Sequence, residues 1–205
     1  MFRRHQLLAV ALLSFATAAL SSGCSEDEQS TPRVTFDSEV APGSNPAKEC
    51  PQTGTWLTVG NFGNPARGRT NPADPESPLV EPVRPVDDGA DEQQGKVSLN
   101  CSVRESGDGF DVAASVELTG ATGGAVTVTG RFTLQGDQAN ITLSLSRRGQ
   151  TYRATDCVAR YDTVAGHGVA AGRVWASITC AKAEDRSSQT NCQTLAQIRL
   201  ENCAQ

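Results

Sequence analysis

An alternation of apolar and polar residues runs through much of the chain after Lys96 and limits what the chain can fold into. Apolar side chains recur at every second position in four successive segments. They are Val97, Leu99, Cys101 and Val103, then Val112, Ala114, Val116 and Leu118, then Val126, Val128, Phe132 and Leu134, then Ile141, Leu143 and Leu145. A period of two predicts β-strands that present one face to a core and the other to solvent.

Short turns containing glycine separate these segments, at residues 107–109, 120–124, 136–137 and 148–149. Connections of this length join antiparallel neighbours, so the segments predict a meander. Three less regular strands are expected at residues 152–161, 169–180 and 194–203. The predicted fold is therefore all-β: an antiparallel β-sandwich or barrel of about seven to eight strands.

The part of the chain before this meander divides into two expected regions. Residues 24–49 are polar and contain proline, which predicts a disordered tether. A single β domain is expected over residues 50–205, with its first strand at residues 53–60. Residues 63–95 contain six prolines, and because proline cannot donate to a sheet ladder, they predict a Pro-rich loop rather than strands.

The N-terminus has the three-part composition of a secretory signal peptide. Arg3 and Arg4 provide positive charge, residues 7–20 are apolar and uncharged, and small residues follow up to Gly23. These features predict a signal peptide over residues 1–23. A plain secretory signal, cut near Ala18 or Gly23, is the alternative. A transmembrane anchor is disfavoured because a spanning helix needs about 20 apolar residues.

The sequence Leu20-Ser21-Ser22-Gly23-Cys24 resembles the lipobox of bacterial lipoproteins, although Ser21 stands where that family usually has leucine. The resemblance implies that the leader is removed before Cys24 and that acyl chains such as palmitate on Cys24 attach the protein to a membrane. Ser25 after the cysteine favours, by the same resemblance, the outer membrane over the inner one. The periplasmic face and the cell surface stay open, and without lipidation the protein would be secreted.

The cysteine count favours disulfide bonds in an oxidising compartment. With Cys24 assigned to lipid, six of the seven cysteines remain, an even number that can all pair. They are Cys50, Cys101, Cys157, Cys180, Cys192 and Cys203. Six cysteines permit fifteen pairings. The polar residues 181–191 favour a Cys180–Cys192 bond that closes a loop, and Cys101 is expected to be a buried disulfide half. The spacing does not suit zinc, and no metal is expected.

The net charge of −5 and the absence of a Lys/Arg cluster argue against nucleic acid as a partner. The only histidine after the leader, His167, lies between two glycines, in an expected hairpin loop. A catalytic interpretation would make it a general base oriented by Asp156 or Asp162. However, no serine lies in a Gly-x-Ser-x-Gly setting, so the sequence predicts no catalytic residue and no cofactor.

Two other groups of residues admit a binding interpretation. Trp56 and Trp175, with Phe62, Tyr152 and Tyr161, could form a stacking platform for a sugar or peptide, although large aromatics in small β domains usually belong to the core. The acidic residues 87–92 offer oxygen ligands for calcium, but they lack the EF-hand spacing. A solvated loop is the preferred interpretation.

The layout of leader, Cys24, tether, Pro-rich insertion and cysteine-rich β domain resembles uncharacterised lipoproteins of myxobacterial type. Thr53-Gly54-Thr55-Trp56 and Gly172-Arg173-Val174-Trp175 are the most distinctive strings. The resemblance implies a location but no activity. The preferred hypothesis is a lipid-anchored, non-catalytic binding or structural module of the cell envelope, with an envelope protein or glycan as partner. The alternatives are a hydrolase of envelope or extracellular polymers and a purely structural coat protein.

Overall fold

The structure is a computed structural model of the chain and describes residues 30–45, 48–63, 70–71, 74–78, 83–93, 95–162, 166–185 and 190–205. These residues form β-strands joined by turns and loops. The strands are β1 (Arg33–Pro42), β2 (Gly54–Val59), β3 (Thr70–Asn71), β4 (Asp74–Pro78), β5 (Val86–Asp87), β6 (Asp91–Glu92), β7 (Gly95–Ser106), β8 (Gly109–Thr119), β9 (Gly124–Thr133), β10 (Gln138–Arg147), β11 (Gln150–Arg160), β12 (Gly168–Ala170), β13 (Arg173–Ala183) and β14 (Cys192–Glu201).

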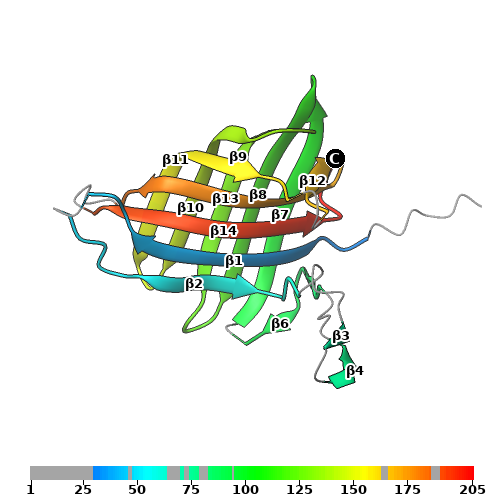
Figure 1. Cartoon of the computed structure of the whole chain (residues 1–205), viewed down its shortest axis with the longest axis horizontal. Coiled ribbons are helices and arrows are strands. Elements are labelled where there is room, and N and C mark those ends of the chain that lie inside the picture. Colours follow the sequence, from blue (N-terminus) through cyan, green and yellow to red (C-terminus); the bar gives the residue numbers. More distant parts are fainter. Residues whose placement is uncertain are drawn as a thin grey trace, which may run out of the picture.

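One antiparallel sheet of twelve strands curls into a nearly closed barrel (Figure 1). Its order is β2-β1-β14-β13-β11-β10-β9-β8-β7-β6, with β5 paired to β1 and β12 paired to β13. In Figure 1, β2, β1, β14 and β13 cross the front, and β7 to β10 cross behind them at a steep angle. The predicted all-β antiparallel fold is confirmed. The predicted number of seven to eight strands is wrong, because short strands extend the sheet.

The meander from β7 to β11 follows the turn chemistry of the sequence. Each strand pairs with the next one along the chain. Between β10 and β11, Arg148 and Gly149 both have positive φ, at 51° and 79°. Positive φ at both central residues is the geometry of a type I′ turn, whose twist matches that of the paired strands. This local geometry fixes the register of the long strands.

Short segments link the two sides of the sheet across its remaining gap. β5 pairs with β1, while β6, which follows it after a tight turn, pairs with β7. The chain after β14 also reaches β7, since the N–H of Ala204 donates to the carbonyl of Cys101 at 3.0 Å. Farther along β2, Arg147 Nη1 donates to the carbonyl of Trp56 at 2.6 Å. These contacts satisfy backbone groups that an open sheet edge would expose.

The inward faces of the long strands are packed with apolar side chains. The alternation seen in the sequence holds in β7, β8 and β10, where every second residue is buried. One predicted core residue is misplaced: Leu134 is 64% exposed, because β9 ends at Thr133 and the chain turns outward there. The largest fully buried side chains are Tyr152, Phe36, Phe132, Leu57, Ile141, Leu143, Leu145, Ile178, Ile198 and Leu200. Because these side chains fill the interior, a ligand would have to bind on the outside of the barrel.

Three disulfides connect the six cysteines: Cys50–Cys192, Cys101–Cys203 and Cys157–Cys180. The pairing of all six and the burial of Cys101, which is 5% exposed, are confirmed. The preferred Cys180–Cys192 bond is wrong. Cys180 faces Cys157 across the β11–β13 pair, and Cys192 is bonded to the segment that precedes β2. Three disulfides indicate a non-cytoplasmic, oxidising location.

Two expectations about the N-terminal half are corrected. The disordered tether over residues 24–49 and a domain beginning at Cys50 do not agree with β1, which pairs with β14 along its whole length. Val34, Phe36 and Val40 are fully buried in the core, so burial of every second residue stabilises this strand despite its polar neighbours. In residues 63–95, the short strands β3 to β6 replace the predicted strand-free loop.

Candidate functional site

The outer face of β13 and β14 carries a polar and aromatic row directly beside the short strand β12. In β14 the inward residues are Ile198 and Leu200, so Arg199 points outward. Its Cα partner on β13 is Trp175, whose own partner on β12 is Gly168. The sheet register therefore places the indole of Trp175 next to the Arg199 side chain on the outside of the barrel.

Trp175 lies at the centre of a cluster of four side chains. The guanidinium carbon of Arg199 is 4.7 Å from the centroid of the Trp175 ring, a cation–π distance. The His167 ring is 4.6 Å from the same indole, and the Phe62 ring stacks at 6.4 Å. Trp175 is half-buried by these neighbours, and its Nε1 is buried without a hydrogen-bond partner in the described structure.

A chain of ion pairs fixes the Arg199 side chain. Arg199 donates to Glu201 Oε1 through Nε at 2.9 Å and through Nη2 at 2.5 Å. Glu201 is also 3.9 Å from Arg33 on β1, and Arg33 pairs with Asp87 on β5 at 3.0 Å. Because two charge-assisted hydrogen bonds to Oε1 restrict the guanidinium, the pairing holds Arg199 in place over Trp175.

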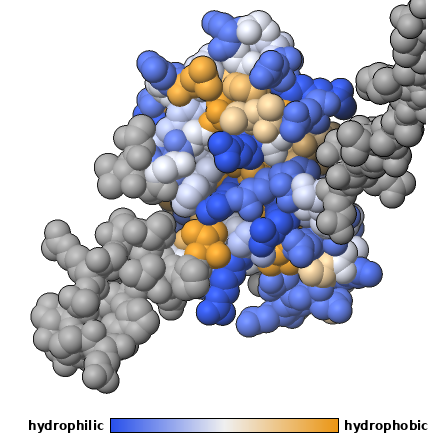
Figure 2. Space-filling view, turned by 90° about the vertical axis from the view of Figure 1, so that its right-hand side faces the viewer, coloured by the Kyte–Doolittle hydropathy of each residue, from blue (hydrophilic) through white to orange (hydrophobic). Residues whose placement is uncertain are grey.

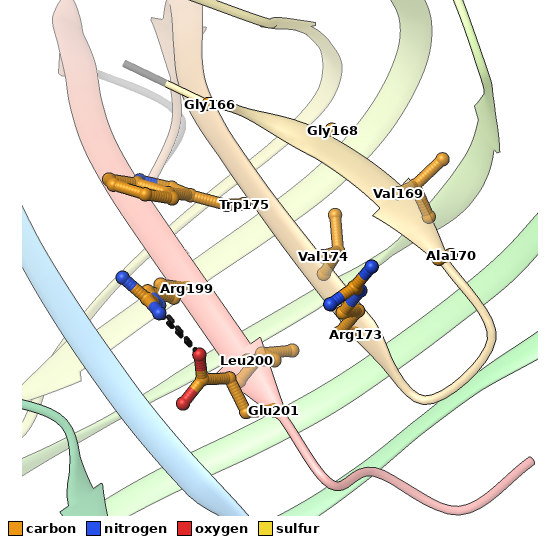
Figure 3. Close-up of a pocket in the computed structure, with 10 residues that line it drawn as sticks. All are labelled: Gly166, Gly168, Val169, Ala170, Arg173, Val174, Trp175, Arg199, Leu200 and Glu201. Carbon is orange, nitrogen blue, oxygen red and sulfur yellow. Dashed lines mark hydrogen bonds and ion pairs between the residues drawn. The ribbon is translucent and has the colours of Figure 1, made fainter.

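A surface pocket of about 290 Å³ lies beside this row, between β12 and the outer face of β13 and β14. Its lining includes Gly166, Gly168, Val169, Ala170, Arg173, Val174, Trp175, Arg199, Leu200 and Glu201 (Figure 3). In Figure 3, Arg199 and Glu201 contact each other on one side, and Arg173 lies apart from them on the side of the β12–β13 hairpin. We call this the Trp175 pocket.

The shape of the Trp175 pocket depends on a break in one strand. β11 and β12 both pair with the same edge of β13. β11 ends at Arg160 and β12 begins at Gly168, and the described residues between them, 161–162 and 166–167, belong to neither strand. At the β12–β13 turn, Gly172 has φ 73°, and a Cβ there would lie 3.2 Å from the carbonyl of Cys203. Glycine at this position therefore permits both the backbone conformation and the close approach of the C-terminal segment.

His167 does not lie in a hairpin loop as predicted, because the strands on either side of it, β11 and β12, both pair with β13 and not with each other. Its backbone N–H donates to the carbonyl of Asp162 at 2.9 Å, and its Nε2 is 3.4 Å from Gln197 Nε2. Burial lowers the pKa of His167, although Asp162 and the backbone of Arg160 act to raise it. The ring therefore packs as a neutral aromatic group against Trp175 at neutral pH.

The other aromatic residues named from the sequence lie elsewhere. Trp56 is 4% exposed and packs edge-on against Tyr152, with ring centroids 5.2 Å apart. Tyr161 donates to the carbonyl of Thr133 at 2.9 Å, and burial raises its pKa to about 12. The structure thus divides the predicted platform. Trp56 and Tyr152 belong to the core, whereas Trp175 and Phe62 share the outer cluster.

The acidic residues 87–92 span the end of β5, the turn after it and β6, which pair with β1 and β7 respectively. Asp87 pairs with Arg33, and Asp88 Oδ1 accepts the N–H of Leu99 at 2.7 Å. Two of these carboxylates therefore have structural partners.

Within the described ranges, no group of three or more potential metal ligands comes together. No helix among the described residues is long and apolar enough to cross a membrane. Cys24, the predicted lipidation site, lies outside the described residues.

A second, more open hollow of about 1040 Å³ adjoins the Trp175 pocket at the end of the barrel. It shares Arg173 and Glu201 with that pocket and extends to the first described residues and the C-terminus. Figure 2 shows this end of the molecule, where hydrophilic residues surround separate hydrophobic patches. The surface beside the Trp175 pocket is therefore predominantly polar.

The sequence interpretation found Trp175, Phe62 and His167 but missed Arg173, Arg199 and Glu201. A usable signal was present: in residues 192–201 the polar residues alternate with the inward-facing Ile198 and Leu200. Comparison of the chain with protein-family models, with curated proteins and with solved structures finds no match in any of the three.

Proposed function

We propose that this protein is a lipid-anchored binding module of the bacterial cell envelope, attached to the outer membrane through acyl chains on Cys24, and that the Trp175 pocket holds its ligand. The module is proposed to be non-catalytic. Its envelope partner is a glycan or a protein. The observation that carries the proposal is a half-buried tryptophan with an arginine over its ring, beside a pocket on the outside of a barrel whose interior is filled.

The charge and rigidity of the pocket support binding. Arg199 is already oriented by Glu201, so a ligand would meet an ordered surface and lose less free energy in ordering it. Aromatic rings combined with a few fixed polar groups are typical of small-ligand sites. His167, whose ring packs against Trp175, has its pKa lowered by burial.

The location is supported by two independent observations. Three disulfides suit an oxidising compartment, and the residues before Cys24 resemble a lipobox. Intact-mass measurement of protein purified from its own cells tests the anchor directly. We expect a chain that begins at Cys24 with added acyl mass. A mature chain that begins after Cys24, or one with an unmodified thiol at that position, would contradict the anchor.

Binding is tested with the disulfide-bonded protein against envelope fractions and a glycan array. We expect a ligand whose binding is lost in Trp175→Ala, whereas the fold persists because Trp175 lies outside the core. Trp56→Ala is the comparison for folding: loss of a buried tryptophan should cost about 3–5 kcal/mol of unfolding free energy. Hydrolysis of the ligand by the wild-type protein would overturn the non-catalytic part of the proposal.

A further inference from the structure

We propose that the Trp175 pocket recognises a sugar that carries a carboxylate, with the carboxylate on Arg173 and the sugar ring beside Trp175. This inference rests on the proposed binding function and specifies its ligand. It assigns Arg173 as the residue that determines specificity. The ligand class is an acidic saccharide of the uronic acid type, one or two residues in size at the pocket itself.

The charge of the pocket favours an anion. Arg199 and Arg33 are engaged by Glu201 and Asp87, whereas Arg173 forms no ion pair with any residue in the part of the chain that the structure describes. Three arginines thus face two carboxylates, which leaves one positive charge on a chain whose formal net charge is −5. An exposed guanidinium beside a fixed ion pair is suited to binding a carboxylate through two parallel hydrogen bonds.

The position of Arg173 relative to Trp175 fits a ring-shaped ligand. The two residues are two positions apart on β13, so both side chains project from the outer face. Both line the pocket, together with the backbone of Gly168. The indole also has an unpartnered Nε1–H, buried within the cluster. A hydroxyl-rich ligand offers acceptors for this hydrogen bond, whereas a purely apolar ligand offers none.

The size and edges of the pocket argue against an extended peptide. Its volume of about 290 Å³ lies at the small end of the range for ligand sites. Peptides that bind to a sheet edge need a run of free backbone groups, and β12 has only three residues. A compact ligand with one negative charge suits these dimensions better than a strand-forming segment.

Uronic acid di- and trisaccharides, each paired with its methyl ester, test the inference with the disulfide-bonded protein. Esterification removes the charge and keeps the ring. We expect the acids to bind about tenfold to a hundredfold more tightly than the esters, the range for a hydrogen bond to a charged group. Arg173→Gln should remove this preference. Arg104→Gln, an exposed outward-facing arginine of β7, is the matched control and should retain it.

The two tryptophans provide an internal readout by nuclear magnetic resonance. With two tryptophans in the chain, the spectrum has two indole N–H signals. Binding should shift the Trp175 signal and leave that of the buried Trp56 in place. The inference is overturned if acids and esters bind equally, if Arg173→Gln keeps the preference, or if no acidic sugar binds while a neutral glycan or a peptide does. In that last case the proposed binding function survives. Absence of any ligand in the array and the envelope fractions contradicts that function itself.

Discussion

At the scale of single residues, burial changes the pKa of both tyrosines, Tyr152 and Tyr161. Burial raises the pKa of Tyr161 to about 12. Burial, with a smaller contribution from Asp185, also raises the pKa of Tyr152. Both phenols therefore stay protonated at a pH where free tyrosine, with a pKa of about 10, is half ionised. The native state binds these protons more tightly than the unfolded state does.

We predict that the folded protein shows little phenolate absorbance near pH 10, whereas the unfolded protein titrates there. Because the native pKa values are raised, the tyrosine contribution to stability is complete below pH 10 and is lost as the pH rises toward 12. A rapid spectrophotometric titration measures this. Tyr161→Phe is the control, since it leaves Tyr152 as the single phenol. A wild-type titration centred at pH 10 in the folded state would contradict the prediction.

At the scale of elements, β1 shows where sequence patterns fail. Val34, Phe36, Ser38 and Val40 alternate inward, but polar and charged residues on both sides conceal so short a pattern. The later strands were predictable because apolar alternation continues over longer runs and glycine turns separate them. The break between β11 and β12 and the pairing of the six cysteines were not predictable, because both depend on which strands lie side by side in the barrel.

The position of β1 leads to a prediction about truncation. A chain that starts at Ser30 keeps β1, whereas one that starts at Gly43 exposes the edge of β14 and removes Val34, Phe36 and Val40 from the core. Burial of three such side chains contributes roughly 5–9 kcal/mol, comparable with the total stability of a domain. We expect only the longer chain to unfold cooperatively in a thermal scan followed by circular dichroism. Equal melting temperatures for the two chains would show that β1 is dispensable.

At the scale of the whole molecule, the disulfides restrict the unfolded chain to different degrees. Cys101–Cys203 spans 102 residues and joins β7 to the C-terminal segment, whereas Cys157–Cys180 spans 23 residues between paired strands. On the chain-entropy model these loops contribute roughly 5 and 3 kcal/mol, respectively. The longer crosslink also holds the contact that closes the barrel beside the second hollow.

We therefore predict that replacing Cys101 and Cys203 by alanine lowers the free energy of unfolding more than replacing Cys157 and Cys180 does. Denaturant titration measures the difference. Hydrogen exchange adds a local readout: the N–H of Val103, which donates to the carbonyl of Ala204 at 2.9 Å, should exchange faster only in the first variant. Equal losses of stability with unchanged exchange would contradict this account.

The start of β1 at Arg33 also determines how far the molecule could reach. Nine residues lead from Cys24 to Arg33, and fully extended they span at most roughly 30 Å. Arg33 contacts Glu201, which lines the Trp175 pocket. The pocket therefore lies at the end of the barrel where β1 begins. If Cys24 is acylated as we propose, the Trp175 pocket would therefore reach ligands close to the membrane surface that holds the chain and would not reach a distant layer.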